Sequence, residues 1–279
     1  MTTNNDYQWP RVTVVICTYD RAVEFYKTIR ALKRNIAYPN LDFLIADDGS
    51  KDDVLDSMVE DLALAFDFED DKPVQVTQTD RKGWGANVNY ALSQVETDYV
   101  FFIEDDHVLL KPLDLRPYVA LLGTYHQIGM VRFGISGHDG IRATLREYDI
   151  PEDILPGYTE AHGLGSTHPG KLNAWELHLG KYASWGPYGF YRYSNRPHLK
   201  HRRFHDAYGY YAEGLPLATT EEEFNLRITA AHQRNERQHT VGGNGPVLPS
   251  IVVPCEWTYW HFDHIGKSRQ GTEEDVSNG

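Results

Sequence analysis

The sequence predicts an α/β protein in which helices cover both faces of a mixed, mostly parallel sheet. Two observations predict this fold. Short, continuous apolar runs alternate with segments of helical periodicity up to residue 106, and acidic clusters follow three of the apolar runs. Strands that are buried on both faces read as uninterrupted apolar runs, which is typical of a parallel sheet between helices. Because ligands bind beyond the carboxyl ends of such strands, we expect the acidic clusters to meet in one crevice.

Strands and helices are expected in regular alternation in this first part. The predicted strands are Val12–Cys17, Leu41–Ala46, Val74–Thr77 and Tyr99–Ile103. Apolar residues at helical spacing predict one helix through Phe25, Ile29 and Leu32, a second from Val54 to Leu64, and a third at Asn87–Val95.

The periodicity weakens after residue 110. Pro, Gly, Trp and Tyr are dense between residues 151 and 214, which favours long loops in an irregular extension. One helix is expected from about Thr220 to His232, with Thr219 or Thr220 as its N-cap and carboxylates in its first turn.

The composition is that of an ordinary globular protein with a strong acidic balance. A net charge of -13 argues against broad electrostatic binding to nucleic acid or to an anionic membrane. No apolar run approaches the roughly 20 residues that span a bilayer, and the N-terminus lacks the apolar core of a signal peptide. Cys17 and Cys255 are expected to be free thiols. We therefore expect a cytoplasmic protein without integral membrane contact.

The strongest single element is Glu104-Asp105-Asp106, directly after the apolar run YVFFI. Carboxylates in this position can hold Mg²⁺ or Mn²⁺ and bridge it to a diphosphate. An isolated acidic triplet is more often a solvated turn. Because two other acidic clusters follow strands upstream, metal binding is the favoured interpretation.

A second element, Asp47-Asp48-Gly49-Ser50, follows the second strand. Its carboxylates can accept hydrogen bonds from a ribose hydroxyl or a base N–H, and Gly49 permits a tight turn. The alternative is an Asx turn that caps the next helix, and both roles are compatible. The Gly-rich segment that begins at Lys82 matches neither a Walker loop nor a dinucleotide fingerprint, so a tight strand-to-helix turn is the simpler interpretation.

Taken in order, these segments resemble the nucleotide-binding half of family 2 glycosyltransferases of the GT-A fold. The segments that carry the resemblance are VTVVICTYDR, IADDGSKD, RKGWGANVNYAL and DYVFFIEDDH, over roughly residues 11 to 113. The resemblance implies a GT-A (Rossmann-like) sheet with an irregular acceptor-side extension. It also implies a nucleotide-sugar donor, UDP by default, and Mn²⁺ or Mg²⁺ bound through a DXD motif, which reads EDD here. Asp20 and Val88 depart from the Asn and Arg that the family usually carries.

The resemblance assigns a nucleotide-sugar-binding half to residues 9–110 and an acceptor-binding and catalytic half to residues 111–265. Residues 266–279 are expected to form a flexible tail. The implied nucleotide-binding residues are Thr18, Tyr19, Asp20, Asp47, Asp48, Lys82, Gly83, Asn89, Glu104 and Asp105. Asp106 is the implied direct metal ligand.

The segment TEEEFNLR is similar in spacing to the family segment that carries the catalytic base. Arg227 fixes the register, which puts Glu221 at the base position and Glu223 at the position of a helix carboxylate. An inverting transfer needs one carboxylate within hydrogen-bond reach of the acceptor hydroxyl. Three glutamates that merely decorate the positive end of a helix are the competing interpretation.

A late histidine is expected to complete the metal site, because GT-A enzymes often recruit one. The segment WTYWHFDHIG offers His264 as the preferred ligand and His261 as the alternative. Imidazole suits Mn²⁺ better than Mg²⁺ on grounds of softness.

One basic, aromatic stretch runs from Tyr193 to His205 in this acidic chain. A solvated charged face is the default interpretation, and a donor-diphosphate clamp, a grip on an anionic acceptor and a nucleic-acid contact are the alternatives. The candidate acceptor or phosphate contacts are Trp185, Arg196, Arg202 and Arg203.

The function that these features favour is metal-dependent, inverting transfer of a sugar to an acceptor hydroxyl. The acceptor can be a glycan, a protein or a modified base in DNA. One alternative is a nucleotidyltransferase that makes nucleotide sugars, although such enzymes carry a Gly-rich, Arg-containing loop where this chain has CTYDRA. The other is a non-catalytic module that binds a glycan or a protein partner.

Overall fold

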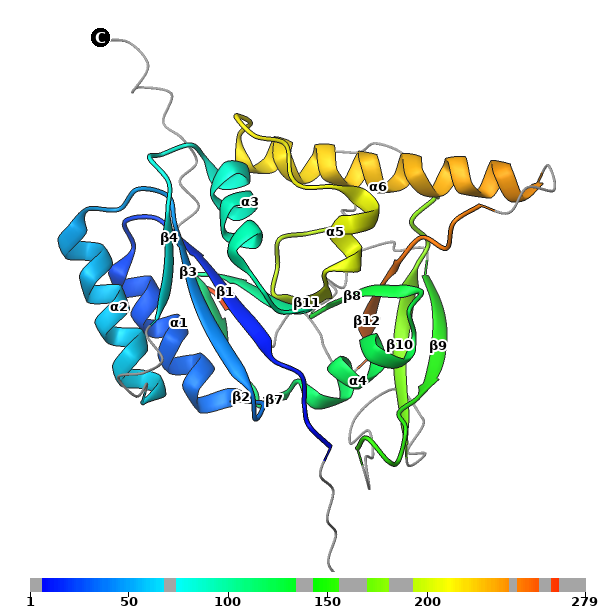
Figure 1. The fold of residues 1–279 in the computed structure, drawn as a ribbon, viewed down its shortest axis with the longest axis horizontal. Coiled ribbons are helices and arrows are strands. Elements are labelled where there is room, and N and C mark those ends of the chain that lie inside the picture. Colours follow the sequence, from blue (N-terminus) through cyan, green and yellow to red (C-terminus); the bar gives the residue numbers. More distant parts are fainter. Residues whose placement is uncertain are drawn as a thin grey trace, which may run out of the picture.

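A computed structural model describes residues 7–67, 74–133, 143–155, 170–180, 193–240, 245–255 and 262–265. In this part of the chain a nine-stranded sheet runs in the order β4-β3-β1-β5-β11-β8-β12-β10-β9, with helices on both faces (Figure 1). The sheet continues without a break across the two expected halves, because β11 forms hydrogen bonds with β5.

The first part of the sheet is parallel. Its strands are β1 (Val12–Thr18), β3 (Leu41–Asp47), β4 (Gln75–Gln78) and β5 (Tyr99–Glu104), which confirms the four predicted strands to within a residue. The helices between them are α1 (Ala22–Asn35), α2 (Asp52–Phe66) and α3 (Trp84–Gln94). Helix α3 begins earlier than predicted, because Gly83 adopts φ +89° and turns the chain directly into the helix.

Strands β1, β3 and β5 are largely buried on both faces, as their apolar runs predict, whereas the edge strand β4 is mostly exposed. On β1, Val14 and Ile16 pack with α1 and α2 in one core cluster. Val15 and Cys17 face the opposite side and pack with α3 and α6 in a second cluster. Figure 1 shows α1 and α2 together beside the parallel strands, with α3 and α6 on the other side.

The second part extends the sheet with strands of mixed direction. They are β8 (Ile128–Arg132), β9 (Ala143–Asp149), β10 (Lys171–Leu177), β11 (His198–His201) and β12 (Ser250–Pro254). Strand β11 is antiparallel to both β5 and β8, and β12 is parallel to β8. The expectation of long loops between residues 151 and 214 therefore missed β10 and β11. The polar letters HLKH conceal a strand in which His198, Leu199 and Lys200 are all buried.

Two short ladders lie beside the main sheet. Strand β2 (Ile36–Ala37) pairs with β7 (Leu113–Asp114) in parallel. Strand β6 (His107–Leu109), which follows β5 after a two-residue turn, pairs antiparallel with β13 (Phe262–His264). The second ladder brings the end of the described chain back to the acidic end of β5.

The remaining helices are α4 (Arg116–Thr124), α5 (Arg203–Tyr208) and α6 (Leu217–Thr240). Helix α6 is longer than predicted and begins before Thr219 and Thr220, so the prediction that one of them is its N-cap is wrong. Pro216 precedes the helix, and its carbonyl accepts a hydrogen bond from the Thr220 N–H at 2.9 Å. Proline, with its preset φ and missing N–H, is the start signal here.

Candidate functional site

The acidic clusters meet at the carboxyl ends of the three central strands. The parallel register pairs Thr18 of β1 with Asp47 of β3, and Cys17 with Glu104 of β5. Two backbone hydrogen bonds continue the pairing just beyond the strand ends. The Asp48 N–H donates to the Thr18 carbonyl at 3.1 Å, and the Asp105 N–H donates to the Cys17 carbonyl at 3.0 Å. The predicted convergence of carboxylates at one sheet edge is therefore present.

Asp47 organises the turn after β3. Its side chain is fully buried and accepts hydrogen bonds from the N–H groups of Gly49 and Ser50 at 3.0 and 2.8 Å, and also from the Ser50 hydroxyl. The Gln78 amide donates to the same carboxylate at 3.0 Å. These contacts leave Asp47 no surface for a ligand, which corrects the expectation that it contacts a nucleotide.

Asp48 is partly exposed and links two loops at the same edge. Its carboxylate accepts hydrogen bonds from the Thr79 hydroxyl at 2.6 Å and from the Gly83 N–H at 3.1 Å. Beside it, the Arg81 guanidinium lies 4.5 Å from the centre of the Tyr19 ring. Tyr19, Asp48 and Gly83 are thus brought together, with the exposed Lys82 next to them.

Asp105 points into the protein. Its carboxylate accepts a hydrogen bond from the Thr18 hydroxyl at 2.8 Å and lies 3.4 Å from the Arg21 guanidinium. Burial raises the pKa of Asp105 to about 7, although Thr18 and Arg21 oppose that shift. Thr18 and Asp105 therefore hold the ends of β1 and β5 together, which corrects the expectation that they contact a nucleotide.

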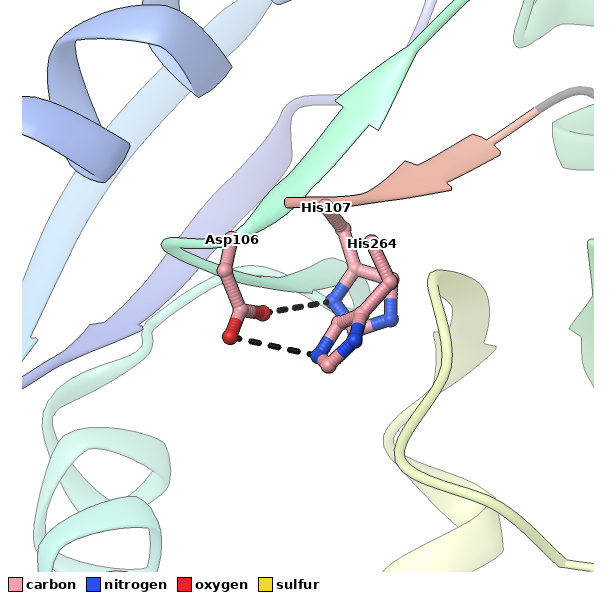
Figure 2. A group of neighbouring side chains, drawn as sticks. All are labelled: Asp106, His107 and His264. Carbon is pink, nitrogen blue, oxygen red and sulfur yellow. Dashed lines mark ion pairs between the residues drawn. The ribbon is translucent and has the colours of Figure 1, made fainter. Parts of the chain in front are cut away.

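Asp106, His107 and His264 form a cluster where β5 turns into β6 (Figure 2). The Asp106 carboxylate lies 3.3 Å from Nδ1 of His107 and 3.2 Å from Nε2 of His264. Burial opposes ionisation of Asp106, but the two imidazoles and the Arg21 guanidinium, at 2.5 Å, outweigh it and lower the pKa of Asp106 to about 2. This carboxylate is therefore ionised at every physiological pH.

A cavity of about 200 Å³ opens beside this cluster. Glu104, His107 and His264 line one side, and Glu221 and Arg196 line it from the second part of the chain. The Trp84 indole N–H donates to the Glu104 carboxylate at 3.1 Å. Burial, followed by the charges of Asp106 and Glu221, raises the pKa of Glu104 well above its usual range.

Glu221 reaches the cavity from the first turns of α6. Its carboxylate accepts a hydrogen bond from the Asn195 N–H at 2.7 Å, which fixes its position. Burial raises the pKa of Glu221 above that of an exposed glutamate. Glu223, two residues along, instead pairs with Arg227 on the helix surface. Glu221 thus lies in the cavity, whereas the Glu223 carboxylate lies on the helix surface outside it.

Two predicted contacts, Arg202 and Arg203, lie away from this cavity. Arg202 pairs with Asp98 at 3.5 Å, and Arg203 donates to the carbonyls of Ile128 and Leu122. Because β11 runs antiparallel to β5, the residues after it lie at the opposite edge of the sheet from Glu104. Arg202 and Arg203 therefore lie apart from the acidic cluster, and their expected contact with phosphate or acceptor stays a prediction.

Asn89 lines a hollow together with Thr79 and Lys82, so its expected contact with a nucleotide stays a prediction. Its side chain donates to the Tyr211 carbonyl and to the Glu213 carboxylate, both at 2.9 Å, and accepts from the Tyr211 N–H at 3.0 Å. Asn89 therefore fastens α3 to the loop before α6. Trp185 and His261 lie outside the described residues.

Sequence reasoning missed Arg21, Trp84 and His107. Arg21 belongs to the TYDR segment and His107 follows EDD directly, so both were adjacent to recognised motifs. The sequence signal for His107 was its position directly after the acidic cluster. Its neighbour His264 is revealed only by the pairing of β6 with β13.

The model of glycosyl transferase family 2 matches residues 13–174, which is more than half of the chain. The chain belongs to glycosyltransferase family 2. It is 30% identical over 104 residues to a GalNAc(5)-diNAcBac-PP-undecaprenol beta-1,3-glucosyltransferase from Campylobacter jejuni, a match that covers 37% of this chain and 31% of that protein. It is 31% identical over 150 residues to beta-1,4 N-acetylgalactosaminyltransferase 1 from Rattus norvegicus, which covers 53% of this chain and 25% of that protein. These matches span a third or less of the relatives.

Solved structures share the fold of this family 2 chain. S. aureus TarS matches with a TM-score of 0.53 and 16% identity, over 89% of this chain and 36% of TarS. TarS 1–349 in complex with UDP matches with a TM-score of 0.52 and 17% identity, over 89% of this chain and 59% of that one. The expected GT-A α/β fold is thus confirmed. Among the described helices, none has the length and apolarity needed to cross a bilayer.

Proposed function

We propose that this chain transfers a sugar from a nucleotide-sugar donor to an acceptor hydroxyl, with inversion at the sugar carbon. The observation that carries the proposal is the cavity at the carboxyl end of β5, which Glu221 of α6 lines together with His264, the partner of Asp106. Family membership and the likeness to TarS, which has been solved with UDP and with UDP-GlcNAc, support a nucleotide-sugar donor. UDP is the proposed nucleotide.

The nucleoside is proposed to bind over the loops that follow β1 and β3. Tyr19 and Asp48 offer an aromatic face and a partly exposed carboxylate for a base and a ribose, and Lys82 offers a positive charge for phosphate. Asp20 is exposed and adopts φ +52°, with its N–H donating to the Ser50 hydroxyl at 2.7 Å. This bond holds the loop after β1 against the DDGS turn, so both sides of the proposed nucleoside site are fixed in advance.

Asp106 and His264 are the residues proposed to hold a divalent ion, Mn²⁺ or Mg²⁺. They fit such an ion, because the buried Asp106 Oδ1 has no hydrogen-bond partner and an imidazole nitrogen lies 3.2 Å from the other carboxylate oxygen. When bound, the ion would supply positive charge that stabilises the departing diphosphate. Arg21, which holds Asp106 from the protein side, keeps the carboxylate ionised and oriented.

Glu221 is proposed to act as the base. Its carboxylate accepts the proton of the acceptor hydroxyl while the acceptor oxygen forms a bond to the anomeric carbon of the sugar. The bond from that carbon to the phosphate oxygen breaks, and the nucleoside diphosphate leaves with the electron pair. The Asn195 N–H holds the Glu221 carboxylate in place, and the raised pKa of Glu221 brings its basicity closer to that of the group it must deprotonate.

Arg196 is the basic residue proposed to face the donor phosphates or the acceptor, because it lines the cavity. The basic stretch that raised the possibility of a DNA acceptor gives that idea little support. Its aromatic side chains Tyr193 and Phe204 are buried and offer no stacking surface for bases, and the charge of Lys200 is buried as well. A soluble glycan or a protein is therefore the proposed acceptor.

Purified protein should be incubated with UDP-, GDP- and dTDP-sugars in the presence of Mn²⁺, and release of the nucleoside diphosphate measured. We expect turnover with at least one donor and its loss in Glu221→Gln, whereas Glu222→Gln, the neighbour on the same helix, should retain it. Silence with all donors, or full activity of Glu221→Gln, would overturn the proposal.

A further inference from the structure

The turn after β5 places a second imidazole beside the proposed metal ligands. Strand β6 begins at His107 and pairs with β13 so that His107 lies directly opposite His264. The two ring centres are 5.0 Å apart, and both rings reach the Asp106 carboxylate, one at each oxygen (Figure 2). The antiparallel register, which fixes this pairing, therefore builds a carboxylate flanked by two imidazoles.

The three ligand atoms have spacings that suit one small ion. They all lie within 4.8 Å of one another, and the two carboxylate–imidazole distances are 3.3 and 3.2 Å. Neighbouring ligands of an octahedral ion with bonds of about 2.1 Å lie about 3 Å apart, and those of a tetrahedral ion lie only slightly farther apart. The side chain of His264 is 44% exposed, so its ring is free to close the remaining gap to His107.

Two of these atoms are buried and lack hydrogen bonds. Although Asp106 Oδ1 and His107 Nδ1 are 3.3 Å apart, their directions do not make a hydrogen bond, and neither has another partner in the described part of the chain. A buried polar atom without a partner is costly unless something else satisfies it. A cation between the two atoms would satisfy both.

The other carboxylates of the EDD motif are engaged elsewhere. Glu104 is held by the Trp84 indole, and its nearer oxygen is still 3.7 Å from His107 Nδ1. Asp105 is turned inward to Thr18 and Arg21. Arg21 also takes Oδ2 of Asp106, so the buried atoms of this described segment that remain without a hydrogen bond are Asp106 Oδ1 and His107 Nδ1.

We infer that His107 is a third protein ligand of the divalent ion, so that one carboxylate and two imidazoles select first-row transition ions over Mg²⁺ and bind them before the nucleotide arrives. Imidazole favours transition metals, whereas Mg²⁺ prefers oxygen ligands and gives up its water reluctantly. The inference rests on the proposed function for the identity of the site. It adds a ligand and a metal preference that the EDD motif does not specify.

The test measures Mn²⁺ binding to the nucleotide-free protein. Pulsed electron paramagnetic resonance counts the imidazole nitrogens coordinated to Mn²⁺, and titration calorimetry gives the affinities for Mn²⁺, Co²⁺ and Mg²⁺. The variants are His107→Gln and His264→Gln, with the exposed His126→Gln as the matched control. Labelling with [¹⁵N]histidine confirms that the coupled nitrogens belong to histidine.

Wild type and His126→Gln should show two nitrogens and bind Mn²⁺ at least about tenfold more tightly than Mg²⁺, with Co²⁺ tighter still. His107→Gln and His264→Gln should each show one nitrogen and lose at least about tenfold in Mn²⁺ affinity, with less effect on Mg²⁺. One nitrogen or none in the wild type would overturn the inference, and this result needs no variant to fold. Unchanged Mn²⁺ affinity in His107→Gln would also overturn it.

Donor turnover, measured in the same preparations, separates this inference from the proposed function. Two coordinated nitrogens without turnover of any donor would uphold the metal site and count against the transfer. Turnover with one coordinated nitrogen would uphold the transfer and remove His107 from the metal site.

Discussion

Replacing the buried Lys200 by Met should make the protein more stable, and the gain should shrink as the pH rises. Lys200 lies on β11 in the middle of the sheet and is only 1% exposed. Its ammonium group donates to the Tyr211 hydroxyl at 3.3 Å and lies 5.5 Å from the ring centres of Phe102 and Tyr211. These contacts compensate only partly for lost hydration, and burial lowers the pKa of Lys200 to about 7.

The magnitude follows from the difference between the folded and unfolded pKa values. The unfolded pKa is 10.5, and each pH unit between the two values is worth about 1.4 kcal/mol. Between pH 7 and 10.5 the unfolded chain holds a proton that the folded chain has released, so stability rises with pH. At pH 7.5 the buried lysine therefore costs about 4 kcal/mol, and at pH 9 about 2 kcal/mol.

Lys200→Met removes this cost and loses one hydrogen bond worth about 1 kcal/mol. Urea unfolding should therefore find the variant more stable by about 3 kcal/mol at pH 7.5 and by about 1 kcal/mol at pH 9. The exposed Lys27→Met should change neither value, because its charge is in solvent in both states. A difference between Lys200→Met and wild type that is the same at both pH values, or a variant less stable than wild type at pH 7.5, would refute this reasoning.

Three further changes probe the site and its supports. Activity should fall as the pH is lowered through the raised pKa of Glu221, because protonated Glu221 cannot accept the acceptor proton; a rate that is flat down to pH 4 would exclude that role. Gly85→Ala should cost about 1–3 kcal/mol in urea unfolding, because its Cβ would lie 2.3 Å from the Ala212 carbonyl oxygen, whereas Gly123→Ala, facing only the Tyr99 hydroxyl, should cost less. Asp48→Asn should weaken UDP binding at least about tenfold in calorimetry through loss of a charged acceptor, and equal affinity would remove Asp48 from the nucleoside site.

The parallel part of the fold could be predicted because its signal is local. Three of its strands, β1, β3 and β5, are predominantly apolar runs, and each is followed by polar residues that mark the binding edge. The second part could not, because its strands carry polar letters that become buried only through tertiary contacts. His198 is buried against Phe102 and Tyr193, and Lys200 against Phe102 and Tyr211, and the local sequence HLKH gives no sign of these contacts.

The sequence predicted which motifs form the site, but not which side-chain atoms of those motifs face it. Sequence alone indicated the edge at which Asp48 and Asp106 would meet. It could not show that Asp47 and Asp105 turn inward. Neighbouring carboxylates in one motif are chemically the same, and only their hydrogen bonds in the folded protein show which of them stabilises a turn and which faces the crevice. The sequence also could not identify the role of His107. Its partner His264 lies far away in the chain and is brought to it by the three-residue strand β13.

Broadening of the ³¹P resonances of UDP by protein-bound Mn²⁺ tests the central claim most directly, since that claim places diphosphate and ion together at Asp106. With wild-type protein, both phosphorus signals should broaden strongly, beyond the effect of the same Mn²⁺ concentration without protein. Asp106→Asn should abolish this enhancement while its unfolding in urea remains cooperative. If UDP and Mn²⁺ both bind the wild type and the ³¹P signals stay sharp, ion and diphosphate occupy separate sites and the account is contradicted.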